Sequence, residues 1–127
     1  MASAVPYVEH HITHGGHMIY AREYPGQDPA YVMMHGFPDN LHIYDYVVPY
    51  LTQASRRVVV FDFLGFGQSE KVTQKNYPYT FEQQVGDLAA VADALKLNKS
   101  SFRLVTTLVA PAPSTIRLTI IGLPGFA

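Results

Sequence analysis

Hydrophobic positions in the first third of the chain fall into short runs that predict β-strands. The segments Val8 to Thr13 and His17 to Tyr24 are two such runs. Gly15-Gly16 lies between them and accepts the positive φ angles of a tight hairpin turn. The run from Tyr31 to His35 is apolar without alternation, which is typical of a strand buried on both faces. We therefore expect an antiparallel hairpin followed by the first strand of a parallel sheet.

From Asn40 onward, the apolar spacing changes to that of a helix. Asn40 is able to cap the first free N–H groups, and Pro49 is expected to bend or restart the helix. The residues on the apolar face of this helix are Leu41, Tyr44, Val48 and Leu51. The segment Arg57 to Phe61 then predicts a second buried strand, which ends in a glycine loop.

The clearest helix signal begins at Thr80. Thr80-Phe81-Glu82-Gln83 has the form of a capping box. Apolar residues then repeat at helical spacing, at Phe81, Val85, Leu88, Ala92 and Leu95. Strands that alternate with helices after an initial hairpin indicate an α/β fold, with a parallel sheet and helices packed on its faces.

The last quarter of the chain has a different composition. No Asp or Glu follows Asp93, while Thr, Pro and Leu are frequent. The stretch from Phe102 to Val109 predicts another strand, but Pro111 and Pro113 block its extension into a helix. We therefore divide the chain into residues 1–99, which form the α/β part, and a divergent tail of residues 100–127.

Composition and charge exclude several classes of function. The chain has no cysteine and a net charge of -1 without a basic stripe, which argues against a Cys metal site, disulfides and a nucleic-acid partner. No apolar run approaches the roughly 18 residues of a spanning helix, so we expect no membrane association and a cytoplasmic location. Four histidines, His10, His11, His14 and His17, lie close together in sequence, but on a strand His10 and His14 point to one face and His11 to the other. No Cys or spaced carboxylate joins them, so we predict no metal site.

Two glycine-containing loops follow predicted strands and carry the candidate chemistry. In His35-Gly36-Phe37-Pro38, the glycine allows a sharp turn that would direct the Phe37 N–H toward a developing oxyanion. Taken alone, this motif also fits an ordinary strand-to-helix turn. The second loop contains Asp62, Gly65, Gly67 and Ser69. The glycines allow tight turning, and the Asp62 and Ser69 side chains are able to bond to loop N–H groups, so we expect a structural role for Asp62. A phosphate-binding loop is disfavoured, because the sequence lacks its glycine pattern and a Walker lysine.

Both loops together resemble the α/β-hydrolase superfamily, especially its epoxide-hydrolase and haloalkane-dehalogenase-like branch. The resemblance runs from about Tyr20 to Lys99 and includes His35-Gly36-Phe37-Pro38-Asp39, Asp62-Phe63-Leu64-Gly65-Phe66-Gly67-Gln68-Ser69 and the helix start at Tyr79-Thr80-Phe81-Glu82-Gln83. It implies that Phe37 supplies an oxyanion-hole N–H in a loop formed with His35, Gly36, Pro38 and Asp39. The Pro38 bond would be cis.

The resemblance also implies a type of reaction. The family's complete enzymes open an epoxide, carbon–halogen or ester bond of a small molecule through a covalent intermediate, without an organic cofactor. Haloalkane dehalogenases tend to have a halide-binding Asn at the position of Phe37, so the motif here is more similar to that of epoxide hydrolases.

The chain departs from the family where the nucleophile should occur. The family carries that residue on a strained turn after the next strand, with an acid and a His much later. The segment Val105 to Val109 occupies this place and contains no such turn. With suitable synonymous codons, the neighbouring reading frame through Phe102 to Ile120 spells a family-like turn containing His-Asp. We therefore expect an inactive N-terminal portion followed by an out-of-frame tail.

The sequence is also compatible with two other functions. The chain could be a non-catalytic interaction module whose unpaired sheet edge recruits a partner strand or a second copy. It could also be part of an esterase or lipase with a Ser nucleophile, because the superfamily shares both loops.

Overall fold

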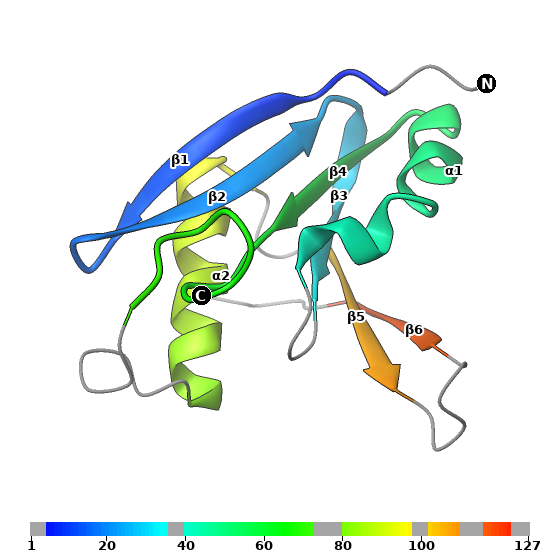
Figure 1. Cartoon of the computed structure of the whole chain (residues 1–127). Coiled ribbons are helices and arrows are strands. Elements are labelled where there is room, and N and C mark those ends of the chain that lie inside the picture. Colours follow the sequence, from blue (N-terminus) through cyan, green and yellow to red (C-terminus); the bar gives the residue numbers. More distant parts are fainter. Residues whose placement is uncertain (1–4, 36–39, 73–79, 98–101, 110–115, 123–127) are drawn as a thin grey trace.

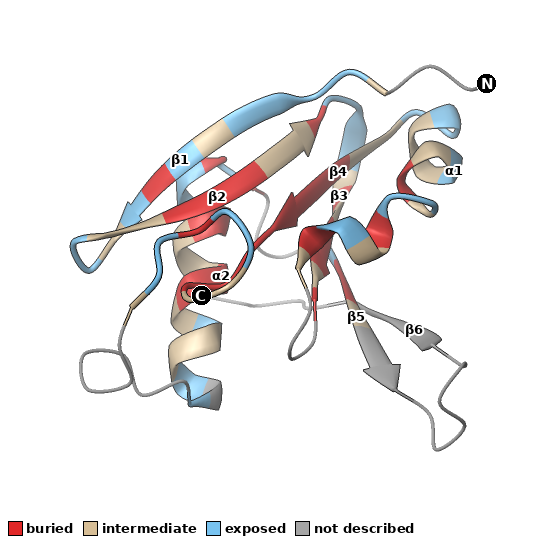
Figure 2. Ribbon diagram, viewed as in Figure 1, coloured by how far each residue is buried: buried red, intermediate tan, exposed pale blue. Residues whose placement is uncertain are grey.

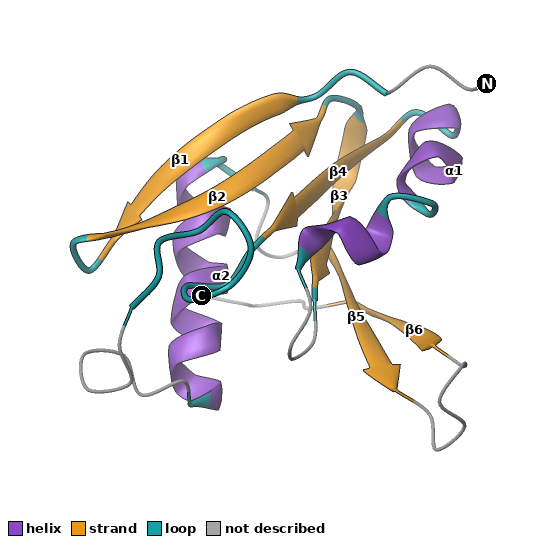
Figure 3. Cartoon of the chain, in the orientation of Figure 1, coloured by secondary structure: helices purple, strands orange, loops and turns teal. Residues whose placement is uncertain are grey.

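A computed structural model describes residues 5–35, 40–72, 80–97, 102–109 and 116–122 (Figure 1). Its strands are β1 (Val8–His14), β2 (His17–Tyr24), β3 (Gln27–Met34), β4 (Arg56–Phe61), β5 (Arg103–Val109) and β6 (Ile116–Gly122). Its helices are the 3₁₀ helix η1 (Leu41–Tyr44) and the α-helices α1 (Val48–Gln53) and α2 (Phe81–Ala94). The secondary structure is coloured in Figure 3. No helix within the described ranges is long and apolar enough to cross a membrane.

The described strands form one mixed sheet in the order β1-β2-β4-β3-β5-β6. Strands β1 and β2 are an antiparallel hairpin, and Gly15 and Gly16 have φ angles of 59° and 80° at its turn. Strand β3 runs parallel to both of its neighbours, β4 and β5. The expected hairpin and parallel strands are therefore confirmed.

Each face of the sheet carries its own hydrophobic cluster. Figure 2 marks the buried residues along the strands and α2. Successive residues of β4 point to opposite faces, so Val59 and Phe61 pack with α2 while Val58 and Val60 pack with η1 and α1. All four residues are at most 1% exposed. This arrangement explains why the strand is apolar without alternation, and burying each side chain contributes about 1.5–3 kcal/mol.

The helix predicted from Asn40 onward is divided in two. The Asn40 side chain accepts a hydrogen bond from the His42 N–H at 2.9 Å and starts η1. The chain then turns, and α1 begins at Val48 with Pro49 in its first turn. Proline lacks the N–H that would bond to the carbonyl of Asp45, so the helix restarts instead of continuing.

Helix α2 begins as the capping box predicts. Thr80 has an extended backbone, and its side chain accepts a hydrogen bond from the Gln83 N–H at 3.2 Å. Leu88, Val91, Ala92 and Leu95 are buried against the sheet. Lys96 follows the helix with a φ of 54°, and this left-handed residue ends the helix.

The start of β3 and the topology of the tail differ most from the sequence prediction. Strand β3 begins at Gln27 rather than Tyr31, and its pairing with β4 is irregular between these residues. The segment contains Asp28 and Pro29, which are rare in strands. In the tail, β6 runs antiparallel beside β5, so the chain returns along the sheet edge.

Candidate active site

The ends of β3 and β4 meet at one edge of the sheet. Met34 pairs with Phe61 in parallel register, so the segments that start with His35 and Asp62 leave the sheet side by side. Loops at the carboxyl ends of parallel strands are the usual location of ligand sites in α/β folds. This edge is the site indicated by the two sequence motifs.

His35 connects the two segments directly. Its Nε2 accepts a hydrogen bond from the Phe63 N–H at 3.1 Å, and the side chain is buried. Its ring lies edge-on to those of Phe63 and Phe66, with centroid distances of 5.1 and 5.2 Å. Because Nε2 is the acceptor, the proton of the neutral imidazole is on Nδ1. His35 therefore fixes the start of the first loop against the second.

Asp62 joins the other end of the first loop to the second loop. Its Oδ1 accepts from the Leu41 N–H at 2.7 Å and its Oδ2 from the Gln68 N–H at 2.8 Å. The residue is 1% exposed, and a buried carboxylate of this kind needs such donors. Gly67 has a φ of +52°, and a Cβ there would lie 2.2 Å from Asp62 Oδ2. A side chain at position 67 would therefore displace the carboxylate.

Ser69 and Gly65 attach the second loop to its surroundings. The Ser69 hydroxyl accepts from the Tyr20 N–H at 2.8 Å and donates to the Asp62 carbonyl. The Gly65 N–H donates to the Glu70 carbonyl at 2.9 Å, and Gly65 has a φ of 91°. The loop from Asp62 to Glu70 is therefore closed on itself and bonded to β2.

Two carboxylates that stabilise this region were not identified from the sequence. Asp87 on α2 is fully buried, and its Oδ2 accepts from the Leu64 N–H at 3.1 Å. Its Oδ1 lies 3.7 Å from His14 Nε2. The sequence contained a signal for Asp87. It lies four residues before Val91 on the inward face of the helix, where a buried carboxylate needs hydrogen-bond donors. The second is Glu70, which bonds to β2.

Glu70 accepts hydrogen bonds from two neighbouring residues of β2. Its Oε2 lies 2.7 Å from His17 Nδ1, and its Oε1 accepts from the Met18 N–H at 3.1 Å. These hydrogen bonds, that of His17 first, lower the pKa of Glu70 below its usual value.

Part of the predicted oxyanion loop lies outside the described residues. These positions are Gly36, Phe37, Pro38 and Asp39. The direction of the Phe37 N–H and the cis bond before Pro38 therefore stay predictions. The described flanks of the loop, His35 and Leu41, both bond to the segment that follows β4.

The N-terminal histidines have separate partners. His10 bonds to Glu23 at 3.0 Å, His17 to Glu70, and the His11 ring packs edge-on against Tyr20. His14 lies near Asp87. In the part of the chain that the structure describes, no three His, Cys, Asp or Glu residues are grouped to hold a metal ion.

The comparisons with known proteins agree with this geometry. Residues 29–108 match the family model described as alpha/beta hydrolase fold, and the chain belongs to that family. It is 34% identical to a haloalkane dehalogenase of Psychrobacter cryohalolentis over 79 residues. The aligned segment covers 62% of this chain and 26% of that protein. It is 35% identical over 68 residues to epoxide hydrolase B of Mycobacterium tuberculosis, covering 54% of this chain and 19% of that protein.

A solved structure shows the same relationship. The haloalkane dehalogenase DatA from Agrobacterium tumefaciens superimposes with a TM-score of 0.67 and 26% identity, covering 84% of this chain and 34% of the dehalogenase. The chain therefore spans about a fifth to a quarter of the curated relatives named above and about a third of this structure. It is related to epoxide hydrolases and dehalogenases of the α/β-hydrolase fold.

Proposed function

We propose that the chain is the oxyanion-loop part of an α/β-hydrolase active site that cleaves an epoxide, carbon–halogen or ester bond. The observation that carries the proposal is the connection between the two loops through His35 and Asp62. These bonds fix both flanks of the segment that contains Phe37. An N–H group that faces the reaction pocket from a loop with fixed flanks would stabilise an oxyanion without reorganisation during the reaction.

The substrate proposal rests on the relatives and on Phe37. The related proteins include a haloalkane dehalogenase and epoxide hydrolase B. The resemblance to this branch implies a covalent enzyme intermediate that water then hydrolyses. It also implies a halide-binding Asn in dehalogenases at the position of Phe37, so Phe37 favours the epoxide hydrolases. Esterase chemistry with a Ser nucleophile stays the alternative.

We further propose that these 127 residues do not hydrolyse such substrates alone. Val105 to Val109 occupies the nucleophile position and supplies no Ser, Cys, Asp or Glu. Oxyanion donors lower the barrier only when an attacking group creates the charge they stabilise. These residues would therefore supply an oxyanion-hole donor but no nucleophile.

An assay of the purified chain tests this proposal. We expect no turnover of styrene oxide, 1-bromobutane or p-nitrophenyl acetate above the rate with heat-denatured chain. Circular dichroism before the assay establishes that the chain is folded. Turnover that His35→Ala abolishes while the circular dichroism spectrum is retained would contradict the inactivity, because it would place a complete catalytic site within these residues.

A further inference from the structure

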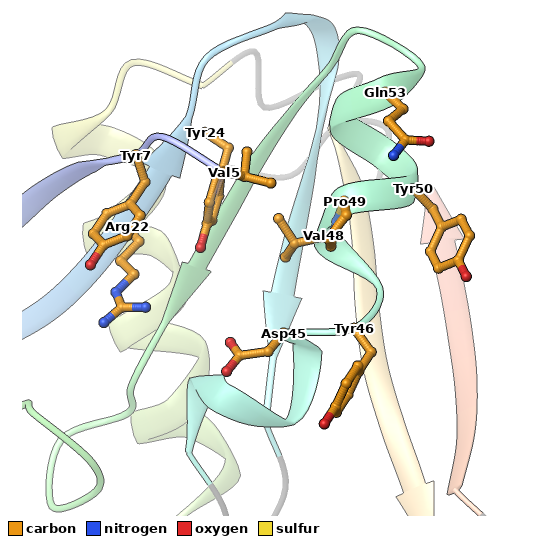
Figure 4. A pocket seen from close by; sticks show the side chains of 10 residues that line it. All are labelled: Val5, Tyr7, Arg22, Tyr24, Asp45, Tyr46, Val48, Pro49, Tyr50 and Gln53. Atoms are coloured by element: carbon orange, nitrogen blue, oxygen red, sulfur yellow. The ribbon is translucent and has the colours of Figure 1, made fainter. Parts of the chain in front are cut away.

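A pocket separate from the candidate active site opens on the face of the sheet that carries η1 and α1 (Figure 4). Its volume is about 530 Å³, within the range of roughly 300–1,000 Å³ typical of small-molecule sites. The hairpin contributes Tyr7, Arg22 and Tyr24, and the chain around α1 contributes Asp45 and Tyr46 among others. None of its lining residues belongs to the loops that follow β3 and β4.

Arg22 is the cation of this pocket, and aromatic side chains hold it in place. Its guanidinium carbon lies 4.4 Å from the centroid of the Tyr7 ring, and its Nε donates to the Tyr20 hydroxyl at 2.9 Å. It also hydrogen-bonds to Tyr24. These contacts reduce the rotamer freedom that Arg22 would lose when it binds a ligand.

Among the described residues, Arg22 has no carboxylate in direct contact. The Glu9 carboxylate lies opposite it on β1 and is connected to it through the Tyr20 hydroxyl, which donates to Glu9 and accepts from Arg22 Nε. Arg57 on the other face of the sheet pairs with Glu23 at 2.7 Å and with Asp28 at 3.6 Å. Arg22, by contrast, forms no ion pair with a carboxylate in the described part of the chain. The planar guanidinium has five N–H donors, and their geometry matches that of a carboxylate.

The remaining walls fit a flat apolar body. Val48 and Pro49 provide apolar surface, and Tyr46 and Tyr50 are 87% and 76% exposed at the rim. Tyrosine provides large contact area with few rotatable bonds. Asp45 adds one negative charge to the wall, and its Oδ2 bonds to His42 Nδ1 at 3.0 Å. This charge disfavours a ligand with two carboxylates.

We propose that this pocket binds a small aromatic monocarboxylate. The carboxylate accepts hydrogen bonds from Arg22, and the ring packs against Val48, Pro49 and the tyrosines. The single charge of the ligand satisfies Arg22 without placing a second carboxylate beside Asp45. This proposal is independent of the hydrolase function, because it uses neither loop of the candidate active site.

Titration of the ¹⁵N-labelled chain with benzoate, followed by NMR, tests the proposal. We expect saturable shifts of the Tyr24, Asp45 and Tyr46 amides. Arg22→Gln should weaken binding by about tenfold or more, the usual effect of losing a hydrogen bond to a charged group. The control Arg103→Gln removes an exposed cation that does not line the pocket and should leave the affinity unchanged.

Further ligands and a second variant separate charge recognition from apolar binding. Benzamide, which has the same shape without the charge, and phthalate, which has two carboxylates, should both bind more weakly than benzoate. Asp45→Asn should tighten benzoate binding, because it removes a negative charge from the pocket wall. If Arg22→Gln does not fold, this variant tests whether charge in the pocket controls binding. The proposal would be overturned if benzamide bound as tightly as benzoate or if benzoate produced no saturable shift. It would also be overturned if Arg22→Gln left the benzoate affinity unchanged or if Asp45→Asn lowered it.

Discussion

Glu70 connects the loop after β4 to strand β2 through both of its carboxylate oxygens. One oxygen lies 2.7 Å from His17 Nδ1 and the other accepts from the Met18 N–H. The Glu70 N–H donates in turn to the Met18 carbonyl at 2.8 Å. The ionised carboxylate is therefore the form that the folded protein stabilises, which makes the attachment of this loop dependent on pH.

The direction of this pH dependence follows from the lowered pKa of Glu70. Its usual value is 4.5, and folding depresses it, so the carboxylate stabilises the fold fully above that value. The stabilisation is lost as the pH falls through the pKa of the folded state. Melting temperatures should therefore show Glu70→Gln less stable than the parent chain at pH 6, with a smaller difference at pH 3.

The control for this prediction is Glu82→Gln, which neutralises an exposed carboxylate on α2, away from the loop. Glu82 lies in the first turn of α2, where an ionised carboxylate also favours the helix. The difference of Glu82→Gln from the parent should therefore change less between pH 3 and pH 6 than that of Glu70→Gln. If the difference between Glu70→Gln and the parent were the same at pH 3 and pH 6, the ionised form would not be the one that holds the loop.

The hydrogen-bond partners of individual site residues could be predicted only where they are near in sequence. Asp62 follows a strand and precedes two glycines, and its bond to Gln68 spans six residues, so a loop-stabilising role was visible. Glu70 and Asp87 bond to Met18 and Leu64, which are 52 and 23 residues away. Those contacts depend on how distant segments pack together, and no local sequence pattern specifies that packing.

At the scale of single elements, the start of α2 depends on Thr80. Its side chain accepts the Gln83 N–H, which otherwise has no partner within the helix. Thr80→Ala should lower the free energy of unfolding by about 1 kcal/mol, measured by urea denaturation. Thr80→Ser keeps the hydroxyl and should retain most of the stability. An equal loss in both variants would show that the cap does not contribute.

Element types could be predicted better than element boundaries. The buried run Val58 to Phe61 and the spacing from Leu88 to Leu95 reflect packing on the sheet, so both elements appear as expected. The first two residues of β3, Gln27 and Asp28, are polar and exposed, and they join the strand because Gln27 pairs with Arg56 of β4. Such pairing between distant segments overrides local propensity.

At the scale of the whole molecule, the tail continues the sheet in an unexpected direction. Strand β5 lies parallel to β3, whereas β6 pairs antiparallel with β5 from Arg103–Gly122 to Val109–Ile116. A parallel strand would need a crossover, which in α/β folds is usually a helix. The described tail therefore differs in topology from the alternating pattern of the earlier residues.

The coding DNA decides whether a frame change produced this tail. We propose that the change lies between about Asn98 and Thr106. The third bases of the codons from Phe102 to Ile120 should then allow the neighbouring frame to encode His-Asp across Thr106 and Thr107. Sequencing of the genomic region checks this directly. Codons that are incompatible with His-Asp in that frame would show that residues 100–127 are the intended sequence.

The position of β2 beside β4 rather than β3 has a consequence during translation. The hairpin is complete once Tyr24 leaves the ribosome, but its inner edge has no neighbour until Phe61 has been synthesised. At about 5–20 residues per second, this interval lasts a few seconds. Throughout it, the nascent hairpin presents unpaired backbone groups to other chains, so aggregation of newly made protein would begin at this edge of β2.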